Sequence, residues 1–475
     1  MKFSFIRTFG YFIGGIWTAW GGRKRIEAKQ LKNLRRLIQK ARNKSPYFNK
    51  LYAHLPDTNL IRLNDLPVTS KVELMGDFDN WLTDRSLTLA QAREHMGDMD
   101  NLGVPIGQYA VFRTSGSSGE PAVVVLPSSA LEFAFGLSLA RFSKKQLRIT
   151  KKLEKAGAKI SIAGGSGHFA GVGLNKLMQD LTPRFTKKIT FIPAEQPIEE
   201  TVKQLNGVGK IASITTYPST LEILTREKEA GRLVIEPKLL KVAGETFTAE
   251  HRERVERAFS SLELGVLDVY ASTECFCMAF ECDCGRKHVP EDWVILEAVD
   301  ENKQPVPDGE LSATTLLTVL SNHVQPFIRY DLGDCLRFYR DPCSCGSPFR
   351  SFQIEGRQAT VIRVENVTLS PLAFDLEHES ARRVQLVQTS ELVFEVRAEL
   401  LGHENPGQVF EQIIQSVNGV FAKNGLVDVN VGKSDTPPHL TASGKFHEVI
   451  PYKNQSGASA DRINEKSNKS PDLNQ

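Results

Sequence analysis

The sequence predicts an α/β protein that ends in a second, small α+β domain. The chain has 475 residues, of which 41% are hydrophobic and 24% charged, which is enough for two or three domains with a substantial core. Strand patterns followed by helical patterns run through residues 211–259. Near the C-terminus, strand patterns at Val384–Val387 and Leu392–Leu400, a helical pattern at Gln408–Lys423 and alternating valines at 427, 429 and 431 indicate the small domain.

The other elements follow from periodicity and from helix start and stop signals. Helices are expected at Arg25–Leu55, Ser128–Lys145 and Ala249–Phe259, and strands at Lys159–Ala163 and Leu239–Ala243. Ser45-Pro46 should end the first helical run. A strand from Ile211 should stop at Pro218, and Ser219 should cap the next helix with Glu222 at the capping-box position.

The charge balance and the cysteines limit the function classes. A net charge of +3 argues against a dedicated nucleic-acid binder. The seven cysteines are concentrated in Cys275–Cys345 with C-x-C spacing, which suits reduced thiols or a metal better than a secreted disulfide framework. We therefore expect a cytoplasmic protein.

Residues 1–24 form an aromatic, apolar segment between Lys2 and Arg23 that Arg7 interrupts. It lacks the cleavage site of a signal peptide and is not a clean span of ~20 residues, so no stable membrane insertion is expected. We expect it to pack against the protein's own core. The alternative is peripheral membrane contact, with Trp17 and Trp20 near the surface.

A Ser/Gly loop connects two strand patterns, one ending at Arg113 and one at Val123–Val125. Glycines let backbone N–H groups turn inward and hydroxyls add donors, so such a loop can cradle a polyphosphate. No Gly-Lys-Ser/Thr follows, which excludes the Walker pattern. The alternative is a flexible surface loop. The candidate ligands are Thr114, Ser115, Gly116, Ser117, Ser118 and Gly119.

This loop resembles the phosphate loop of the adenylate-forming superfamily of acyl-CoA synthetases. Three further stretches follow in that family's order: LDVYASTE (267–274), QPFIRYDLGDCLR (325–337) and LTASGKF (440–446). ARNKSPYFNKLY and NDLPVTSKVEL look most like its phenylacetate-CoA ligase and deazaflavin-cofactor adenylyltransferase branch. The resemblance implies a large ATP- and acyl-binding domain (1–355) of mixed β-sheets and helices and a small mobile domain (356–453). The polar residues 454–475 predict a disordered tail.

The resemblance implies roles for the residues of LDVYASTE. Tyr270 would stack on the adenine base, Thr273 would hydrogen-bond a phosphate, and Glu274 would bind Mg²⁺ through oxygen. Ala271 stands where the family has glycine, and its methyl group would crowd the substrate carboxylate or the acyl pocket.

Two turns would complete the nucleotide site. The resemblance assigns Gly244, Glu245 and Thr246 to the adenine ring. A carboxylate after a tight glycine turn can accept from two vicinal hydroxyls, so Asp334 would bind the ribose, with Arg329 or Arg337 nearby for charge.

The acyl pocket is expected around a Gly-rich segment and a strand end. Five glycines surround His168 and Phe169 and allow close approach to a ligand. A buried structural histidine is the alternative for His168. Tyr217 lies at a strand end, where α/β sheets bind ligands, and Ala271 would line the same pocket.

Lys445 is the candidate catalytic cation, because it stands at the lysine of the family's Thr-x-x-Gly-Lys. A solvated surface lysine is the alternative. Arg357 occupies the arginine of the family's Gly-Arg-x-Asp hinge and is a second catalytic candidate, whereas Ala359 and Thr360 stand where acidic residues are usual.

The knuckle-like pieces CDCGRKH and CSCG could supply tetrahedral ligands to a structural zinc. The candidates are Cys282, Cys284, His288, Cys343 and Cys345. Buried free cysteines are the alternative. Cys275 and Cys277 are expected in the pocket or the core.

The implied reaction activates a carboxylic acid, which we expect to be aromatic or aryl-acetic, with MgATP to an acyl-AMP and then transfers the acyl group to coenzyme A. Alternatives are an adenylyltransferase, or acyl transfer to a carrier-protein or enzyme thiol. A non-catalytic nucleotide-binding protein is the alternative of another class. The expected partners are a small carboxylate and coenzyme A, with an acyl-carrier protein as a further candidate and the oligomeric state left open.

Overall fold

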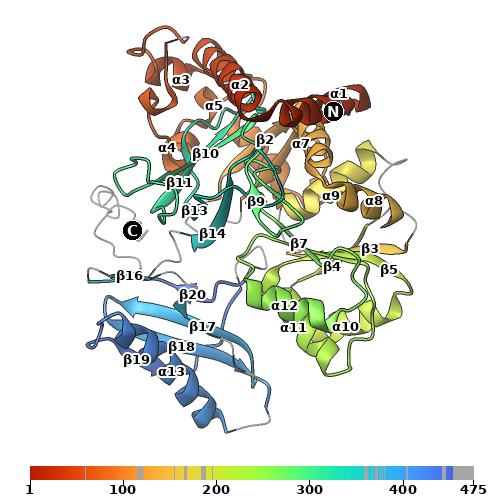
Figure 1. Cartoon of the computed structure of the whole chain (residues 1–475), viewed down its shortest axis with the longest axis vertical. Helices are drawn as coiled ribbons and strands as arrows, with labels where there is room; N and C mark the ends of the chain where they lie inside the picture. The colour runs from red at the N-terminus through yellow and green to blue at the C-terminus, as the bar shows by residue number, and fades with distance from the viewer. Residues whose placement is uncertain are drawn as a thin grey trace, which may run out of the picture.

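The computed structural model of this chain places a small C-terminal domain against one end of a large domain (Figure 1). It describes residues 1–58, 60–114, 121–153, 156–164, 168–182, 189–194, 196–357, 362–365, 367–369, 373–374, 376, 378, 380–402, 405–440 and 445–452. The predicted tail beyond residue 453 lies outside these ranges.

Helices dominate the first hundred residues. They are α1 (Phe5–Trp20), α2 (Gly22–Lys44), α3 (Pro46–Leu51), α4 (Lys71–Gly76), α5 (Phe78–Trp81) and α6 (Leu89–Gly97), with short 3₁₀ turns at Leu63–Asp65 and Met99–Asn101. The helix predicted from Arg25 to Leu55 is divided at Ser45, as its Ser-Pro step indicates. Ser45 accepts a hydrogen bond from the Phe48 N–H and so caps α3.

A five-stranded parallel sheet forms the centre of the large domain. Its strands are β3 (Ala158–Ala163), β4 (Ile189–Pro193), β5 (Ile211–Thr216), β6 (Leu239–Ala243) and β7 (Val266–Val269), in the order β4-β3-β5-β6-β7. Its helices are α8 (Lys144–Leu153), α9 (Ala170–Leu181), α10 (Ile198–Gly207), α11 (Pro218–Glu229) and α12 (Ala249–Ala258). The inner strands β5 and β6 are mostly buried, because a strand inside a parallel sheet is covered on both faces.

Antiparallel sheets flank this centre. The hairpin of β1 (Tyr109–Arg113) and β2 (Val123–Pro127) leads into α7 (Ser128–Arg141). One sheet has the order β10-β11-β12 (Val294–Val299, Thr314–Val319, Tyr330–Asp331), and another has β13-β14-β9-β8 (Asp334–Phe338, Ser351–Arg357, Lys287–His288, Phe280–Glu281). The helix predicted at Ser128–Lys145 ends earlier, at Arg141, and α8 begins at Lys144.

The small domain packs α13 (Pro406–Lys423) against a four-stranded sheet of order β19-β18-β17-β20 (Asn430–Lys433, Val393–Leu400, Ala381–Ser390, Val449–Ile450). A hairpin of β15 (Ile362–Val364) and β16 (Val367–Leu369) precedes it. Phe394 and Phe421 meet in its separate apolar core, with ring centroids 4.8 Å apart. The alternation predicted from Val427 is only partly correct, since Val427 is exposed and β19 begins at Asn430.

Helix α1 packs along α7, as expected for a segment that contacts the protein's own core. Two glycines bring the helices close together, Gly15 against Ala140 and Gly136 against Tyr11. Among the described residues, no helix is long and apolar enough to cross a membrane.

We expect Gly136→Ala to weaken the contact between α1 and α7. An added Cβ would meet the carbonyl oxygen of Thr8 and lie 2.8 Å from the Tyr11 Cβ. Overpacking of this kind costs ~1–3 kcal/mol, so the midpoint of thermal unfolding should fall in a calorimetric scan. Gly14→Ala is the matched control, because Gly14 has no atom within 4 Å of its Cβ position. An equal fall in both variants would contradict packing at Gly136 as the cause, because a change from glycine to alanine by itself favours a helix.

Candidate functional site

A cleft of about 650 Å³ lies between the parallel sheet and the small domain, and we call it the interdomain cleft. Most of the predicted site residues that the structure describes line it: Thr114, Phe169, Tyr217, Gly244, Glu245, Thr246, Tyr270, Ala271, Thr273, Glu274, Asp334, Arg357 and Lys445. These residues come from eight separate stretches of sequence.

The parallel sheet explains why three of these stretches meet. Thr216 pairs with Val242, and Ala243 pairs with Val269, so β5, β6 and β7 end at the same edge. The segments that follow these strands begin with Tyr217, Gly244 and Tyr270 respectively. Ligands of open α/β sheets bind outside such carboxyl ends.

Asp334 is held by two side chains in the cleft. The antiparallel register of β13 and β14 places it opposite Arg357, whose Nε donates to Asp334 Oδ1 at 2.8 Å. The Tyr270 hydroxyl donates to Oδ2 at 2.6 Å. Burial and the neighbouring carboxylate raise the pKa of Tyr270, and Asp334 raises the pKa of Arg357.

The expectation that Arg329 or Arg337 supplies charge beside Asp334 is therefore wrong. Arg329 is buried and forms an ion pair with Glu297, and Arg337 forms one with Glu355. Arg357 takes that position because pairing between strands, rather than sequence proximity, determines which side chains meet.

Glu274 is buried at the wall of the cleft, in the loop after β7. Its Oε1 accepts a hydrogen bond of 3.3 Å from the Tyr330 hydroxyl. Burial, followed by the charge of Glu274, raises the pKa of Tyr330. A carboxylate in this position has the chemistry of a Mg²⁺ ligand, since Mg²⁺ binds through one or two carboxylates together with substrate phosphates.

Lys445 reaches the cleft from the small domain and lies over Gly244. A Cβ on Gly244 would be 3.0 Å from Lys445 Cε and 3.2 Å from Nζ, and Gly244 has a φ of +90°, which favours glycine. Burial lowers the pKa of Lys445, as does Arg357, whereas Glu245, Asp334 and Glu274 act in the opposite direction. Three carboxylates of the cleft thus favour the charged form of this ammonium group.

Glu245 joins the two domains. Its Oε2 accepts from the N–H of Ser219 at 2.9 Å, and its Oε1 accepts from the N–H of Phe446 at 2.7 Å. Burial raises its pKa, and these two hydrogen bonds oppose that effect. The predicted capping box at Ser219 is wrong, because Pro218 already starts α11 and Tyr217 is its N-cap. Glu245 instead satisfies the Ser219 N–H.

The Gly-rich segment contributes Phe169 but not His168. Arg113 stacks on the Phe169 ring at 4.6 Å, and both side chains line the cleft. His168 is buried, its Nε2 is 2.8 Å from the carbonyl oxygen of Asp98, and burial lowers its pKa. The structural alternative therefore describes His168 better than the substrate-contacting prediction.

Of the residues predicted to form the phosphate loop, Ser115, Gly116, Ser117, Ser118 and Gly119 lie outside the described residues. Thr114 lines the cleft. Its N–H donates to the Ala122 carbonyl, and the Ala122 N–H donates to its Oγ1, each at 2.9 Å. These bonds close the base of the loop at the edge of the cleft. The predicted hinge residues Ala359 and Thr360 also lie outside the described residues.

The sequence reading did not identify several basic residues that line the cleft: Arg226, Arg382, Arg383 and His447. Burial, together with the positive charge of Lys445, lowers the pKa of His447 to about 4. The adjacent arginines 382 and 383 are the one sequence feature that could have indicated a role in the cleft. Charged residues side by side in a strand usually face solvent, however.

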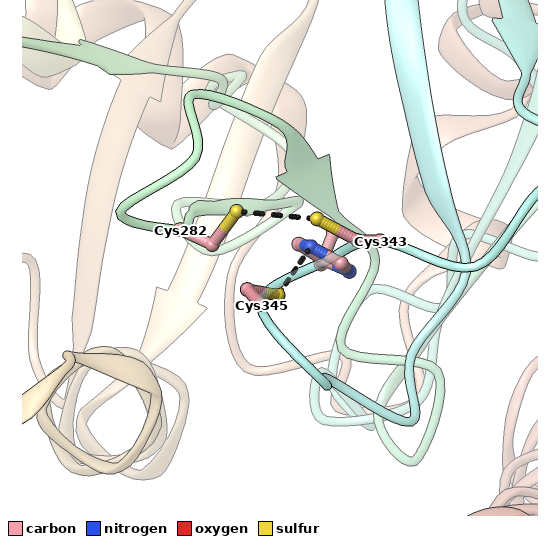
Figure 2. A group of neighbouring side chains, drawn as sticks. Cys282, Cys343 and Cys345 are labelled. Atoms are coloured by element: carbon pink, nitrogen blue, oxygen red, sulfur yellow. Dashed lines mark hydrogen bonds between the residues drawn. The ribbon is translucent and has the colours of Figure 1, made fainter.

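Four of the five predicted metal ligands form a cluster outside the cleft: Cys282, His288, Cys343 and Cys345 each offer an atom within 4.8 Å of the others. The cysteines converge from two separate loops (Figure 2). Cys284 is exposed and is not part of the cluster, which corrects that prediction. Cys275 and Cys277 are buried in the core, and burial raises the pKa of both thiols.

Neither a protein-family model nor a curated protein matches the chain. Solved structures do. A 2-hydroxyisobutyryl-CoA ligase in the postadenylation state with 2-HIB-AMP gives a TM-score of 0.63 at 18% identity, covering 91% of this chain and 90% of that one. The same ligase in an open conformation with 2-HIB-AMP and CoA gives 0.50 at 17% identity, covering 91% of each.

The GH3.15 acyl acid amido synthetase is a third similar structure, with a TM-score of 0.55, 13% identity and coverage of 91% of this chain and 92% of that one. The chain therefore has the fold of the adenylate-forming ligases, with a large domain and a smaller C-terminal region. At these identities the branches of the superfamily are not distinguished, so the likeness to the phenylacetate-CoA ligase branch stays a prediction.

Replacing Glu245 by alanine should loosen the small domain from α11. The variant loses the charged acceptor of two backbone N–H groups, each bond contributing ~1.5–3 kcal/mol. Amide hydrogen exchange should then speed up by about one to two orders of magnitude in the segments holding Ser219 and Phe446. Glu250→Ala, on the exposed first turn of α12, is the control and should change neither segment. Unchanged exchange in the Glu245 variant would mean that other contacts hold the domains together.

Proposed function

We propose that this protein activates a carboxylic acid with MgATP to an acyl-AMP and transfers the acyl group to the thiol of coenzyme A. The observation that carries the proposal is the meeting of Lys445, Glu274 and Asp334 in one cleft of a chain with the adenylate-forming fold. Their three stretches are far apart in sequence, and each brings the residue type that the reaction needs.

The first half-reaction is difficult because a carboxylate must attack the α-phosphate of ATP, which is also negatively charged. Lys445, above Gly244, would neutralise the charge that develops between them. Glu274 would hold the Mg²⁺ that accompanies ATP, and this ion would neutralise phosphate charge. Pyrophosphate leaves as the acyl-AMP forms.

The remaining groups of the cleft would orient the nucleotide. The Asp334 carboxylate, positioned by Arg357 and Tyr270, is the proposed acceptor for the ribose hydroxyls. The Tyr270 ring and the turn at Gly244 would lie against the adenine ring. Thr114 and Thr273, which both line the cleft, are the proposed phosphate donors.

The second half-reaction would require the small domain to turn and admit the thiol. Two observations support the present arrangement as the adenylating one. Lys445 is already in the cleft, and the solved ligase in its postadenylation state gives a higher TM-score than the same ligase in its open conformation. Residues after Arg357, at the start of the predicted small domain (356–453), would supply the hinge.

An aromatic or aryl-acetic acid remains our proposal for the substrate. Phe169, Tyr217 and Phe276 contribute rings to the cleft wall, and aromatic side chains bind flat apolar groups through area and ring geometry. Ala271 adds a methyl group next to Tyr270, which favours a slim group next to the reacting carboxylate.

Two alternatives differ in the fate of the acyl-AMP. In one, the acceptor is a thiol of a carrier protein or another enzyme. In the other, the adenylate itself is the product. A non-catalytic nucleotide-binding protein would bind ATP and exchange no pyrophosphate with any acid.

We expect ATP–pyrophosphate exchange that depends on a carboxylic acid, and thioester formation that depends on added coenzyme A. Lys445→Ala should reduce exchange by roughly two or more orders of magnitude, the effect of losing a charge contact made in the transition state. Transfer of the acyl group from a supplied acyl-AMP to the thiol of coenzyme A, with release of AMP, should change much less, because this lysine would leave the cleft before that step.

The control for this variant is Lys423→Ala, an exposed lysine at the end of α13 in the same domain. Equal losses in both half-reactions of Lys445→Ala would indicate a structural role. Binding of ATP with no exchange for any acid in a broad panel would favour the non-catalytic alternative and refute the proposed activity.

We also propose a structural zinc at the cluster of Cys282, His288, Cys343 and Cys345. The Sγ atoms of Cys282 and Cys343 are 3.7 Å apart, and Cys345 Sγ is 3.5 Å from His288 Nε2. Tetrahedral zinc with its usual bond lengths places two sulfurs ~3.8 Å apart and a sulfur and a nitrogen ~3.6 Å apart. The spacing therefore fits one Zn²⁺ with three thiolates and one imidazole.

The surroundings of His288 favour the same ligand set. Its Nδ1 is 2.9 Å from the Phe349 carbonyl oxygen, an arrangement that protonates Nδ1 and leaves Nε2 available to a metal. The cluster connects the β8–β9 hairpin to the loop between β13 and β14. These last two strands carry Asp334 and Arg357, so a zinc here would support one wall of the cleft.

The zinc proposal predicts about one zinc per chain by elemental analysis and a lower melting temperature after chelation, since structural zinc binding is coupled to folding. Cys345→Ser should lose the metal. Cys284→Ser, two residues from Cys282 but outside the cluster, should keep it. Protein that contains no metal and has an unchanged melting temperature in chelator would contradict the proposal.

A further inference from the structure

Helix α1 presents a continuous apolar stripe to solvent. The exposed fractions are 86% for Ile6, 63% for Phe9, 47% for Ile13, 59% for Trp17 and 85% for Trp20. Their spacing of three or four residues puts all five on one face of the helix. Single exposed apolar residues are common on proteins, but a stripe of this length indicates an interaction surface.

The opposite face of α1 is anchored, so the stripe cannot turn inward. Arg7 forms an ion pair with the buried Glu132 of α7, and the Ser4 N–H donates to the same carboxylate. Arg141 Nη1 donates to the Gly15 carbonyl oxygen at 2.7 Å. The expectation that this segment packs on the protein's own core thus holds for one face only.

Neighbouring residues widen the apolar surface. Phe135 and Leu139, one turn apart on α7, are exposed. The Phe135 ring meets Phe3 edge-on, with centroids 6.0 Å apart, and Phe3 in turn meets Phe5. The stripe is therefore part of a patch made by two helices.

A strong positive charge accompanies the patch. Residues 1–44 contain twelve lysines and arginines and one acidic residue, Glu27, a net charge of +11. The whole chain carries +3, so the other residues carry −8. Lys24, Lys32 and Arg36 are exposed on α2, and Arg25 stacks on Trp17 at 3.8 Å, which links the basic helix to the apolar stripe.

We propose that α1 docks in the interfacial layer of an anionic membrane, with the basic residues of α2 binding the lipid headgroups. Trp and aliphatic side chains on one helix face suit the boundary between headgroups and acyl chains. Each lysine or arginine near an anionic surface adds to the attraction. A second copy of the chain is a poor occupant, because face-to-face docking would place +11 against +11.

The position of the patch is compatible with the proposed activity. Helices α1 and α2 lie at one end of the molecule, and the small domain lies at the other (Figure 1). A membrane bound at α1 would leave the interdomain cleft and the small domain in water.

Cosedimentation with lipid vesicles tests this inference on the full-length protein. We expect binding to vesicles of phosphatidylcholine and phosphatidylglycerol in a 3:1 ratio, weakening with added salt, and little binding to phosphatidylcholine alone. Protein that stays in the supernatant with both vesicles would overturn the proposal, as would equal binding to both at every salt concentration.

Variants test whether the apolar patch and the basic residues of α2 are responsible for vesicle binding. Ile13→Glu and Trp20→Glu should each weaken vesicle binding by about tenfold or more, because each replaces an exposed apolar side chain of the stripe by a negative charge. The double variant Lys24→Glu with Lys32→Glu should weaken binding to anionic vesicles only. Val427→Glu, at a residue 80% exposed in the small domain, is the control and should bind like the unaltered protein.

The melting temperature of each variant verifies folding, and pyrophosphate exchange in solution should be unchanged because these residues lie away from the cleft. Another set of results would show instead that the stripe binds a second copy of the chain. In that case the unaltered protein would form dimers in sedimentation velocity, Ile13→Glu would be monomeric, and neither would bind vesicles.

Discussion

One partly buried carboxylate holds the proposed active arrangement together. Glu245 stands at the end of β6 and accepts hydrogen bonds from the start of α11 and from the segment that carries Lys445. Burial alone would favour the neutral acid, but the N-terminus of a helix and two backbone donors stabilise a negative charge. Lys445 of the small domain is therefore positioned by a side chain that follows a strand of the large domain's parallel sheet.

The cleft also balances its own charges. Lys445 and Arg357 face Asp334 and Glu274 across a small volume, so each charge depends on the others. Burial lowers the pKa of Lys445, and the carboxylates oppose that effect. Such an arrangement is suited to receiving an anionic substrate, because the positive groups are already oriented when it enters and little reorganisation is needed. It also explains why moving one domain would alter the electrostatics of the whole site.

Charge is distributed unevenly at a larger scale as well. The net charge of +3, which argues against a nucleic-acid partner, is the sum of a basic N-terminal region and an acidic remainder of the chain. The proposed zinc cluster and the proposed membrane-docking helix both lie outside the cleft. Each rests on side chains brought together by folding: the cysteines of two loops, and the apolar residues that α7 leaves uncovered.

Local sequence determined most of the elements and the positions of several candidate residues. Strand ends and glycine turns are local features, so Tyr217, Gly244 and Tyr270 could be expected at one edge of a parallel sheet. What the tertiary structure decided is which side chains meet. Arg357 rather than Arg329 reaches Asp334 because of strand register, and His168 turns away from the cleft while Phe169 faces it. Cys284 is left out of a cluster that its neighbour Cys282 joins. Sequence spacing does not specify the direction of a side chain across a turn, or contacts between distant segments, because packing of the whole chain sets both.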